Sequence, residues 1–208
     1  NWIYVGRESD LVEENSFITK TIGDIPVVIQ KLKGRNRAFK NVCSHRHSKI
    51  QLEARGIRPL ICPYHGWTYN NEGSLAGIPK KPLFQFTAKE LECLSLKEYN
   101  LESCGGLIFI HLGEPSYTLK EYLGTFYEWI ESFGKNANNL IDVNSFEIKA
   151  NWKVLVENTL ESYHVALIHK ETFQKLGTSG MNFNFNGKHS LWKTELKKGE
   201  NDGVNKTI

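Results

Sequence analysis

Two short segments, each carrying one cysteine and one histidine, constrain this chain more than any other feature of its sequence. The first reads Cys43-x-His45 and the second Cys62-x-x-His65, with sixteen residues between them. Two thiolates and two imidazoles form a complete metal-ligand set, so the fold must bring both segments together. The chain holds only 4 cysteines in 208 residues, too few for a secreted disulfide scaffold of this size. We therefore expect reduced thiols that are available as ligands.

Zinc and an iron–sulfur cluster compete for such a ligand set. Zinc accepts two cysteines and two histidines, but zinc fingers usually pair Cys with Cys and His with His along the chain. A [2Fe–2S] cluster of Rieske type takes two cysteines on one iron and two histidines on the other. Each segment can then supply one ligand to each iron. The mixed order favours the cluster, and a zinc-binding interaction module is the alternative.

Composition and charge exclude several other classes of protein. Apolar residues make up 40% of the chain and aromatic residues 12%, which is typical of a well-packed core. A net charge of +3 is too small to favour nucleic-acid binding. The longest apolar runs are about half of a bilayer span, and the first residues lack a basic segment followed by an apolar run. We expect a cytoplasmic protein with neither nucleic acid nor membrane as a partner.

Residues 1–115 have the pattern of an all-β domain. Residues 25–32 and 37–43 are apolar, β-branched runs, and the turn-forming residues 33–36 between them predict a hairpin. Such short strands at close spacing predict a small antiparallel barrel or sandwich. Two further turns are predicted at residues 70–73 and 104–106.

The pattern changes near Pro115 to one that includes helices. Thr118 and Glu121 form a capping box, and Gly134 is a natural helix end, so we predict a helix over residues 119–133. Its apolar stripe is assigned to the core and comprises Leu119, Tyr122, Leu123, Phe126, Trp129, Ile130 and Phe133.

The rest of residues 116–208 is less regular. A strand is predicted at residues 146–150 and a second helix over residues 151–168, whereas the tail from Gly177 shows no clear period.

The first pair of segments, in the context CSH…CPYHGWTYNNEGSL, resembles the Rieske domain of ring-hydroxylating, non-haem iron oxygenases. The resemblance implies that a [2Fe–2S] cluster is bound by Cys43, His45, Cys62 and His65. Respiratory Rieske proteins carry an additional disulfide between the two loops. The matching positions here are Ser48 and Tyr64, which favours the oxygenase or ferredoxin branch.

Other residues near these segments receive plainer interpretations. His47 stands where the family often has glycine, and we interpret it as a solvated loop residue. Trp67 is expected to pack beside the cluster and exclude water. Cys93 and Cys104 have no motif around them and are interpreted as ordinary thiols.

A second group of polar residues lies in NWKVLVENTLESYHVALIH, residues 151–169. Glu161 and His164 are three apart and share a helix face. His164 and His169 are five apart, which is a rotation of about 140° on an ideal helix, so both can face one ion only if the helix bulges or ends between them. Spacing alone leaves open an ordinary amphipathic helix and part of a two-histidine, one-carboxylate iron site.

The order NWK…EN…E-x-Y-H-x4-H resembles the start of the catalytic domain of the same oxygenases. The resemblance implies that His164 and His169 bind a mononuclear Fe(II). Glu161 stands where the family usually has an aspartate that bridges to a cluster histidine of the neighbouring subunit. Glutamate there is similar to the branch that acts on quaternary ammonium compounds such as carnitine, choline and betaines. Asn158 and Tyr163 would support the site from outside the metal ligands.

The third iron ligand has no candidate in a matching context. The family takes an aspartate from farther downstream, and we expect that this residue and the remainder of the catalytic domain lie outside this chain. A cation cage of aromatic side chains, with core packing as the alternative, is a further hypothesis for Phe173, Phe183, Phe185 and Trp192. The aspartates considered and rejected as ligands are Asp10, Asp24, Asp142 and Asp202.

The resemblance implies an α+β chain: a Rieske domain (1–115) followed by the first part of a helix-grip, START-like catalytic domain (116–208). A flavin/iron–sulfur reductase, or a ferredoxin, would pass electrons from NAD(P)H to the cluster. The mononuclear iron would then activate O2 to hydroxylate a small organic substrate by monooxygenation, N-dealkylation or C–N cleavage, or alternatively by cis-dihydroxylation of an arene. A homotrimer is implied. The alternative of another class is a Rieske ferredoxin that only carries electrons.

Overall fold

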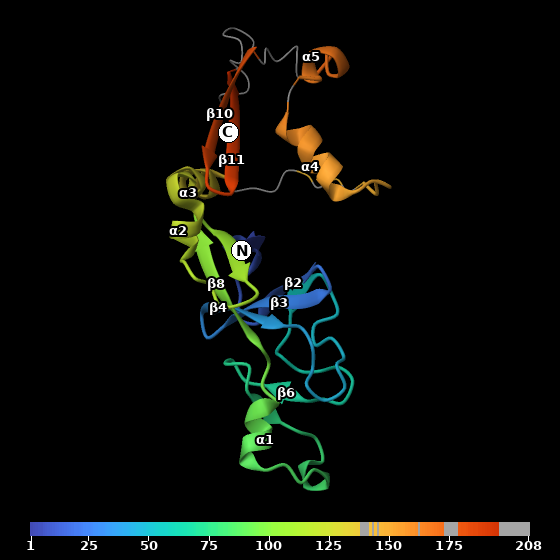
Figure 1. The fold of residues 1–208 in the computed structure, drawn as a ribbon. Helices are drawn as coiled ribbons and strands as arrows, with labels where there is room; N and C mark the ends of the chain where they lie inside the picture. Colours follow the sequence, from blue (N-terminus) through green and yellow to red (C-terminus); the bar gives the residue numbers. More distant parts are fainter. Residues whose placement is uncertain (138–141, 143, 145, 162, 173–178, 196–208) are drawn as a thin grey trace. The chain divides into compact units, whose positions relative to one another are not determined.

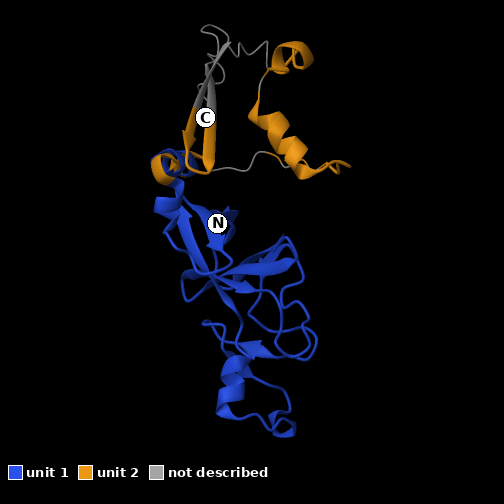
Figure 2. Ribbon diagram, in the orientation of Figure 1, with its two compact units in different colours: residues 1–123, 127–134 blue, residues 124–126, 135–208 orange. Residues whose placement is uncertain are grey.

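The computed structural model describes residues 1–137, 142, 144, 146–161, 163–172 and 179–195. These residues form two compact units, coloured separately in Figure 2. The first unit comprises residues 1–123 and 127–134, and the second comprises residues 124–126 and the described residues after 134. No helix within these ranges is both long enough and apolar enough to span a bilayer.

The first unit is built on an antiparallel sheet of seven strands (Figure 1). All neighbouring strands in it run antiparallel, which confirms the predicted all-β character of this part of the chain. In spatial order, the strands are β1 (Trp2–Arg7), β9 (Leu107–His111), β8 (Glu98–Cys104), β4 (Arg35–Lys40), β3 (Ile25–Leu32), β2 (Ser16–Ile22) and β5 (Arg55–Ile57).

The β3–β4 hairpin has a tighter turn than the sequence predicted. Leu32 pairs directly with Arg35, so the turn contains only Lys33 and Gly34. Both turn residues have positive φ, 51° and 72°, which matches the twist of the flanking strands in a two-residue hairpin. The predicted turn over residues 33–36 was wrong in extent because strand pairing continues through Arg35.

Alternation along β3 separates two apolar cores. Val27 and Ile29 lie in one core, whereas Val28 and Leu32 lie in the other, because successive side chains of a strand point to opposite faces. The second of these cores includes the predicted ligands Cys43 and Cys62. The predicted metal-binding segments therefore contribute to a core that the sheet itself supports.

A smaller two-stranded sheet, β6 (Thr68–Tyr69) and β7 (Leu75–Gly77), carries the predicted turn at residues 70–73. Asn70 closes this turn, since its Oδ1 accepts hydrogen bonds from the N–H groups of Glu72 (3.0 Å) and Ser74 (2.8 Å). A 3-10 turn, Lys81–Leu83, and α1 (Ala88–Cys93) follow β7.

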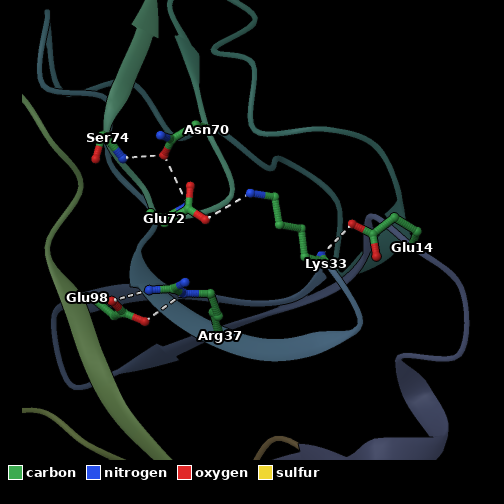
Figure 3. A network of polar contacts seen from close by, with 7 residues as sticks. All are labelled: Glu14, Lys33, Arg37, Asn70, Glu72, Ser74 and Glu98. Carbon is green, nitrogen blue, oxygen red and sulfur yellow. Dashed lines mark hydrogen bonds and ion pairs between the residues drawn. The ribbon is translucent and has the colours of Figure 1, made fainter.

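Figure 3 shows how charged side chains fasten the β3–β4 turn to its surroundings. Lys33 Nζ lies 3.2 Å from a carboxylate oxygen of Glu72, and the Lys33 N–H donates to Glu14 at 2.7 Å. Arg37 makes two parallel 2.9 Å hydrogen bonds to Glu98 across β4 and β8. Both pairs remain accessible to water, and ion pairs of this kind contribute only about 0–1 kcal/mol each, so they add little to the stability of the fold.

The predicted helix over residues 119–133 is interrupted. It consists of α2 (Leu119–Leu123), a 3-10 turn (Gly124–Phe126) and α3 (Tyr127–Asn136), and the break coincides with a positive φ of 53° at Gly124. The capping box is confirmed, because the Thr118 N–H donates to Glu121 at 2.7 Å and the Glu121 N–H donates to Thr118 Oγ1 at 3.2 Å.

The break also divides the predicted apolar stripe. Leu119 and Leu123 are buried, but Trp129 and Phe133 are about half exposed and stack on each other. The helix does not stop at Gly134, which instead fits closely against the Gly105 carbonyl of the β8–β9 turn.

The second unit contains α4 (Trp152–Leu160), α5 (Val165–Ile168) and a hairpin of β10 (Ser179–Asn186) and β11 (His189–Glu195). The predicted strand at residues 146–150 was wrong, since this stretch is irregular and its apolar side chains are exposed. The hairpin was missed. Its sequence signal is the alternation of Asn and Phe that ends in Asn186-Gly187, with Gly187 at φ 57° in the turn.

Candidate metal centres

Loop 1 (residues 43–48) is a tight turn that presents Cys43 and His45 from one short segment. The Cys43 N–H donates to the Ser48 carbonyl at 2.8 Å, and the His47 N–H donates back to the Cys43 carbonyl at 3.0 Å. Closing this turn requires a left-handed backbone at His47, whose φ is 57°. Histidine is among the residues that tolerate this region better than most. The His47 side chain is exposed, so this residue contributes to the loop through its backbone conformation.

Loop 2 (residues 62–67) repeats the backbone pattern of loop 1. The Cys62 N–H donates to the Trp67 carbonyl at 2.8 Å, and the Gly66 N–H donates to the Cys62 carbonyl at 2.9 Å. Gly66 holds the place that His47 holds in loop 1 and has φ 73°. A Cβ atom there would lie 3.1 Å from Pro79, so both conformation and space favour glycine. The two loops are thus equivalent in backbone design.

The four predicted cluster ligands are brought together at the ends of these loops. Cys43 and Cys62 are 1% and 2% exposed. The rings of His45 and His65 lie with their centroids 4.6 Å apart. Trp67 is buried and stacks on His45 with nearly parallel rings at 4.6 Å, so its indole covers one face of that imidazole.

The ionisation and hydrogen bonding of these side chains fit a [2Fe–2S] cluster. His45 Nδ1 is buried and has no hydrogen-bond partner within the described residues, as a nitrogen that binds a metal would. Burial, reinforced by the neighbouring His65 and Arg46, lowers the pKa of His45 and favours the neutral imidazole that can ligate. Burial raises the pKa of the Cys43 thiol, so a metal is the partner that would favour its thiolate.

A site for one metal ion usually needs at least three ligand side chains that point to the same place. Among the residues that the structure describes, no three His, Cys, Asp or Glu side chains are grouped in this way. A Rieske cluster does not require such a group, because each of its two irons takes only two protein ligands.

Tyr69 follows loop 2 by two residues and bonds to loop 1 at the Cys43 sulfur. Its hydroxyl donates to Cys43 Sγ at 3.2 Å and accepts from the Ser44 N–H at 3.0 Å. Burial, reinforced by the bond to Cys43, raises the pKa of Tyr69, so the hydroxyl keeps its proton as a donor. A role for Tyr69 was not predicted from the sequence. The available signal is its position two residues after Trp67, which places both side chains on one side of an extended segment.

The second predicted metal centre lies where α4 ends and α5 begins. Asn151 caps α4, because its side-chain oxygen accepts from the Lys153 N–H at 3.0 Å. Glu161 is extended, with φ −119° and ψ 160°, and ends the helix. The predicted continuous helix over residues 151–168 was therefore wrong. This outcome removes the geometric objection to the histidine pair: α5 is a single turn with His164 before it and His169 after it, and the two ring centroids lie 5.3 Å apart.

Glu161 is bonded to the first of these histidines. One carboxylate oxygen is hydrogen-bonded to His164 Nδ1, and the other accepts from the Tyr163 N–H at 2.5 Å. The His164 hydrogen bond is the main reason that the pKa of Glu161 is lowered. A carboxylate on one ring nitrogen fixes the imidazole and leaves the other nitrogen to a metal, which is the usual arrangement around ligating histidines.

The remaining predicted residues are placed as follows. Tyr163 is 89% exposed and Asn158 is exposed, so neither packs against the histidine pair. Cys93 is exposed, and Cys104 is buried in a separate apolar core. Asp142 is exposed and bonded to Asn144. Asp202 and Phe173 lie outside the described residues, as do the side chains of Phe183 and Trp192, and Phe185 is largely exposed.

Family models match both parts of the chain. Residues 1–94 match the Rieske [2Fe-2S] domain, and residues 136–206 match the catalytic domain of the ring hydroxylating alpha subunit.

Similar curated proteins and solved structures include quaternary ammonium monooxygenases and naphthalene dioxygenases. The glycine betaine monooxygenase oxygenase subunit of Pseudomonas aeruginosa (strain UCBPP-PA14) is 32% identical over 177 residues, which cover 84% of this chain and 41% of that protein. The large oxygenase component of the naphthalene 1,2-dioxygenase system of Ralstonia sp. is 33% identical over 182 residues, covering 84% and 40%. The chain thus spans about two fifths of the length of these curated relatives.

One solved structure is a quaternary ammonium Rieske monooxygenase described in relation to carnitine oxidation by gut microbiota and inter-subunit electron transfer. It has a TM-score of 0.81 at 27% identity, covering 96% of this chain and 55% of that chain. Another is naphthalene 1,2-dioxygenase with indole bound, with a TM-score of 0.71 at 30% identity, covering 82% and 40%. With the paired loops and the histidine pair, these matches identify the chain as a Rieske [2Fe–2S] domain followed by part of the catalytic domain of a ring-hydroxylating alpha subunit.

Proposed function

We propose that this chain provides the electron-accepting domain and part of the active site of a Rieske non-haem iron oxygenase that acts on a quaternary ammonium compound. The observation that carries this proposal is the presence of two candidate metal centres in one chain. The paired loops lie within the first family match, and the histidine pair lies within the second.

The cluster would be held by the thiolates of Cys43 and Cys62 on one iron and the imidazoles of His45 and His65 on the other. When bound, the cluster supplies one-electron transfer and the mononuclear iron supplies O2 activation. Trp67 shields one face of His45, and Tyr69 directs its proton at the Cys43 sulfur. Both contacts influence the reduction potential, which depends on hydrogen bonds to sulfur and on solvent exposure.

The mononuclear iron would be held by His164 and His169, with a carboxylate from outside the described residues as the third ligand. Glu161 holds a proton on His164 Nδ1 and keeps the ring oriented. We further propose that Glu161 links this histidine to the cluster of a neighbouring subunit in a homotrimer. The description of a similar monooxygenase in terms of inter-subunit electron transfer supports this role.

A quaternary ammonium substrate is favoured over an arene by one residue. Structural coverage does not separate the two classes, because a naphthalene 1,2-dioxygenase of Rhodococcus sp. covers 96% of this chain, as the carnitine-related structure does. The residue three before His164 is Glu161 and not the aspartate usual in the family. The second candidate is cis-dihydroxylation of an aromatic ring, which the 33% identity to a naphthalene dioxygenase component supports.

Electrons would come from NAD(P)H through a flavin/iron–sulfur reductase or a ferredoxin. Multi-component relatives support this supply, since the matched naphthalene dioxygenase chain is the oxygenase component of such a system. We place the protein in the cytoplasm, because its predicted ligands are cysteines that must stay reduced. A simple electron carrier is disfavoured by the histidine pair, which cluster chemistry alone does not require.

The decisive experiment combines the natural polypeptide that contains this chain with an NAD(P)H reductase. O2 uptake and release of a tertiary amine are measured with carnitine, glycine betaine or choline, and diol formation is measured with naphthalene. The proposal predicts amine release coupled to O2 uptake, which is lost in His164→Ala while the visible spectrum of the cluster is retained. Diol formation without amine release would favour the second candidate, and a normal cluster without substrate-dependent O2 uptake would favour the carrier.

A further inference from the structure

A buried polar network joins the bases of the two cluster loops. Asn41 lies two residues before loop 1 and Gln51 three residues after it, while Arg58 lies four residues before loop 2. Gln30 reaches the same place from the middle of β3. Gln30 and Gln51 are 0% exposed and Asn41 is 1% exposed, so these amides are as buried as the apolar core around them.

Asn41 closes the base of loop 1. Its Oδ1 accepts from the N–H groups of Ile50 (3.1 Å) and Gln51 (2.9 Å), and its Nδ2 donates to the Gln51 carbonyl at 2.8 Å. The strand that enters loop 1 is thereby fixed to the segment that leaves it.

Gln51 and Arg58 then join loop 1 to loop 2. Gln51 Nε2 donates to the carbonyls of Arg58 (3.0 Å) and Pro59 (3.3 Å), and Arg58 Nε donates back to Gln51 Oε1 at 3.0 Å. The Arg58 guanidinium also donates to the Ile50 carbonyl. Each side chain thus bonds to the backbone that flanks the opposite loop, which makes the connection reciprocal.

Gln30 anchors this connection to the sheet. Its Nε2 donates to the Arg58 carbonyl at 2.6 Å and to the Asn15 carbonyl at 3.1 Å, and its Oε1 accepts from Gln51 at 3.3 Å. No disulfide connects the loops, since Cys43 and Cys62 are both free thiols. In the metal-free protein, noncovalent contacts therefore set the separation of the loops.

We propose that Gln51 and Arg58, anchored by Gln30 and Asn41, are positioning residues that hold the two loops at the separation that a [2Fe–2S] cluster needs. This inference rests on the proposed ligand assignment of Cys43 and His45 in loop 1 and their counterparts in loop 2. Fully satisfied buried polar groups specify one arrangement, because any shift leaves donors or acceptors without partners. The bonds go to the backbone beside the loops, where a shift of one loop against the other would break them.

The test compares three variants of the protein that contains this chain. Gln51→Met keeps the side-chain length and removes every polar contact of the side chain, while the backbone of residue 51 keeps its hydrogen bonds to Asn41. Gln30→Met should disturb the network less, because each carbonyl that loses the Gln30 donor retains another donor. The Asn15 carbonyl still accepts from the Arg58 N–H at 3.1 Å, and the Arg58 carbonyl still accepts from Gln51 Nε2 at 3.0 Å. Val5→Ala is the control, because Val5 lies in the core on the opposite face of β3. The readouts are compared under conditions in which the variants have lost the same number of degrees in melting temperature.

Two readouts separate positioning from general stability. In the metal-free protein, Gln51→Met should speed hydrogen exchange of the Cys43 and Cys62 amides by about tenfold or more, and Gln30→Met by less. In the loaded protein, Gln51→Met should shift or broaden the electron paramagnetic resonance signal of the reduced cluster and speed loss of iron to a chelator. Val5→Ala should leave loop exchange and the signal unchanged.

Wild-type exchange and a wild-type signal in both methionine variants would overturn the proposal. It would also be overturned if Val5→Ala reproduced all the changes at equal stability. Failure of the proposed function is seen separately, as absence of acid-labile sulfide in the wild type. Exchange in the metal-free protein still tests the network in that case.

Discussion

Removal of one hydroxyl, in Tyr69→Phe, is expected to lower the reduction potential of the cluster. The hydroxyl donates to Cys43 Sγ at 3.2 Å in a buried site. Reduction adds negative charge to the cluster and its sulfur ligands, so a donor at sulfur stabilises the reduced state more than the oxidised state. Loss of the donor removes that difference.

The size of the shift follows from the strength of one such bond. A hydrogen bond to a charged group contributes about 1.5–3 kcal/mol in all, and only the difference between the two redox states moves the potential. A difference of about 1 kcal/mol corresponds to about 40 mV for a one-electron couple. The same substitution leaves the Ser44 N–H without its acceptor at 3.0 Å, so we also expect a loss of about 1–3 kcal/mol in the free energy of unfolding.

The assay is a redox titration followed by electron paramagnetic resonance, beside the wild type and Tyr99→Phe. Tyr99 is the matched control, because it is also a buried tyrosine but lies in the core on the opposite face of β3. The reasoning would be refuted if Tyr69→Phe had the wild-type potential, or if Tyr99→Phe lowered it equally.

Three further outcomes are expected. His47→Gly should raise the free energy of unfolding by up to about 1 kcal/mol in denaturant titrations, because a left-handed non-glycine residue costs about 1–2 kcal/mol and the added flexibility of glycine offsets about 0.5–1 kcal/mol; no gain, or an equal gain in His47→Ala, would contradict this. Backbone and side-chain hydrogen bonds from Thr118 lower the pKa of Glu121 in the folded protein. The Glu121 carboxylate therefore adds fully to the free energy of unfolding above the unfolded pKa of 4.5, and this contribution is lost as pH falls through the lower folded pKa. Glu121→Gln should flatten this part of the stability–pH curve, and an unaltered curve would count against the role of Glu121. Glu161→Gln should keep both metals but slow oxidation of the reduced cluster in single-turnover experiments, and an unchanged rate would remove the proposed bridging role.

The candidate cluster ligands were easier to select from the sequence than the path of the backbone. Residue type and spacing group Cys43, His45, Cys62 and His65 as one ligand set, and the family resemblance favours a [2Fe–2S] cluster over zinc. The helix breaks were not predictable in the same way. Apolar periodicity reports which side chains are buried, but it does not register that α5 ends after one turn with His169 outside helical conformation, which is what lets the rings of His164 and His169 lie 5.3 Å apart.

The buried polar residues were the second feature that could not be predicted from the sequence. Gln30 and Gln51 would ordinarily be assigned to the surface, since isolated amides are costly to bury. Their burial is tolerated only because they satisfy each other and the backbone carbonyls around both loops. Such reciprocity depends on residues far apart in the chain and leaves no local pattern.

The central claim, that two matched loops hold a pair of irons through mixed sulfur and nitrogen ligation, is tested most directly by metal and sulfide analysis with electron paramagnetic resonance. Anaerobically purified protein, first stripped of any mononuclear iron by a mild chelator, should retain two irons and two acid-labile sulfides and give a signal on reduction. His45→Ala and Cys62→Ala should each abolish that signal. A colourless protein that holds zinc between the loops and contains no sulfide would contradict the claim.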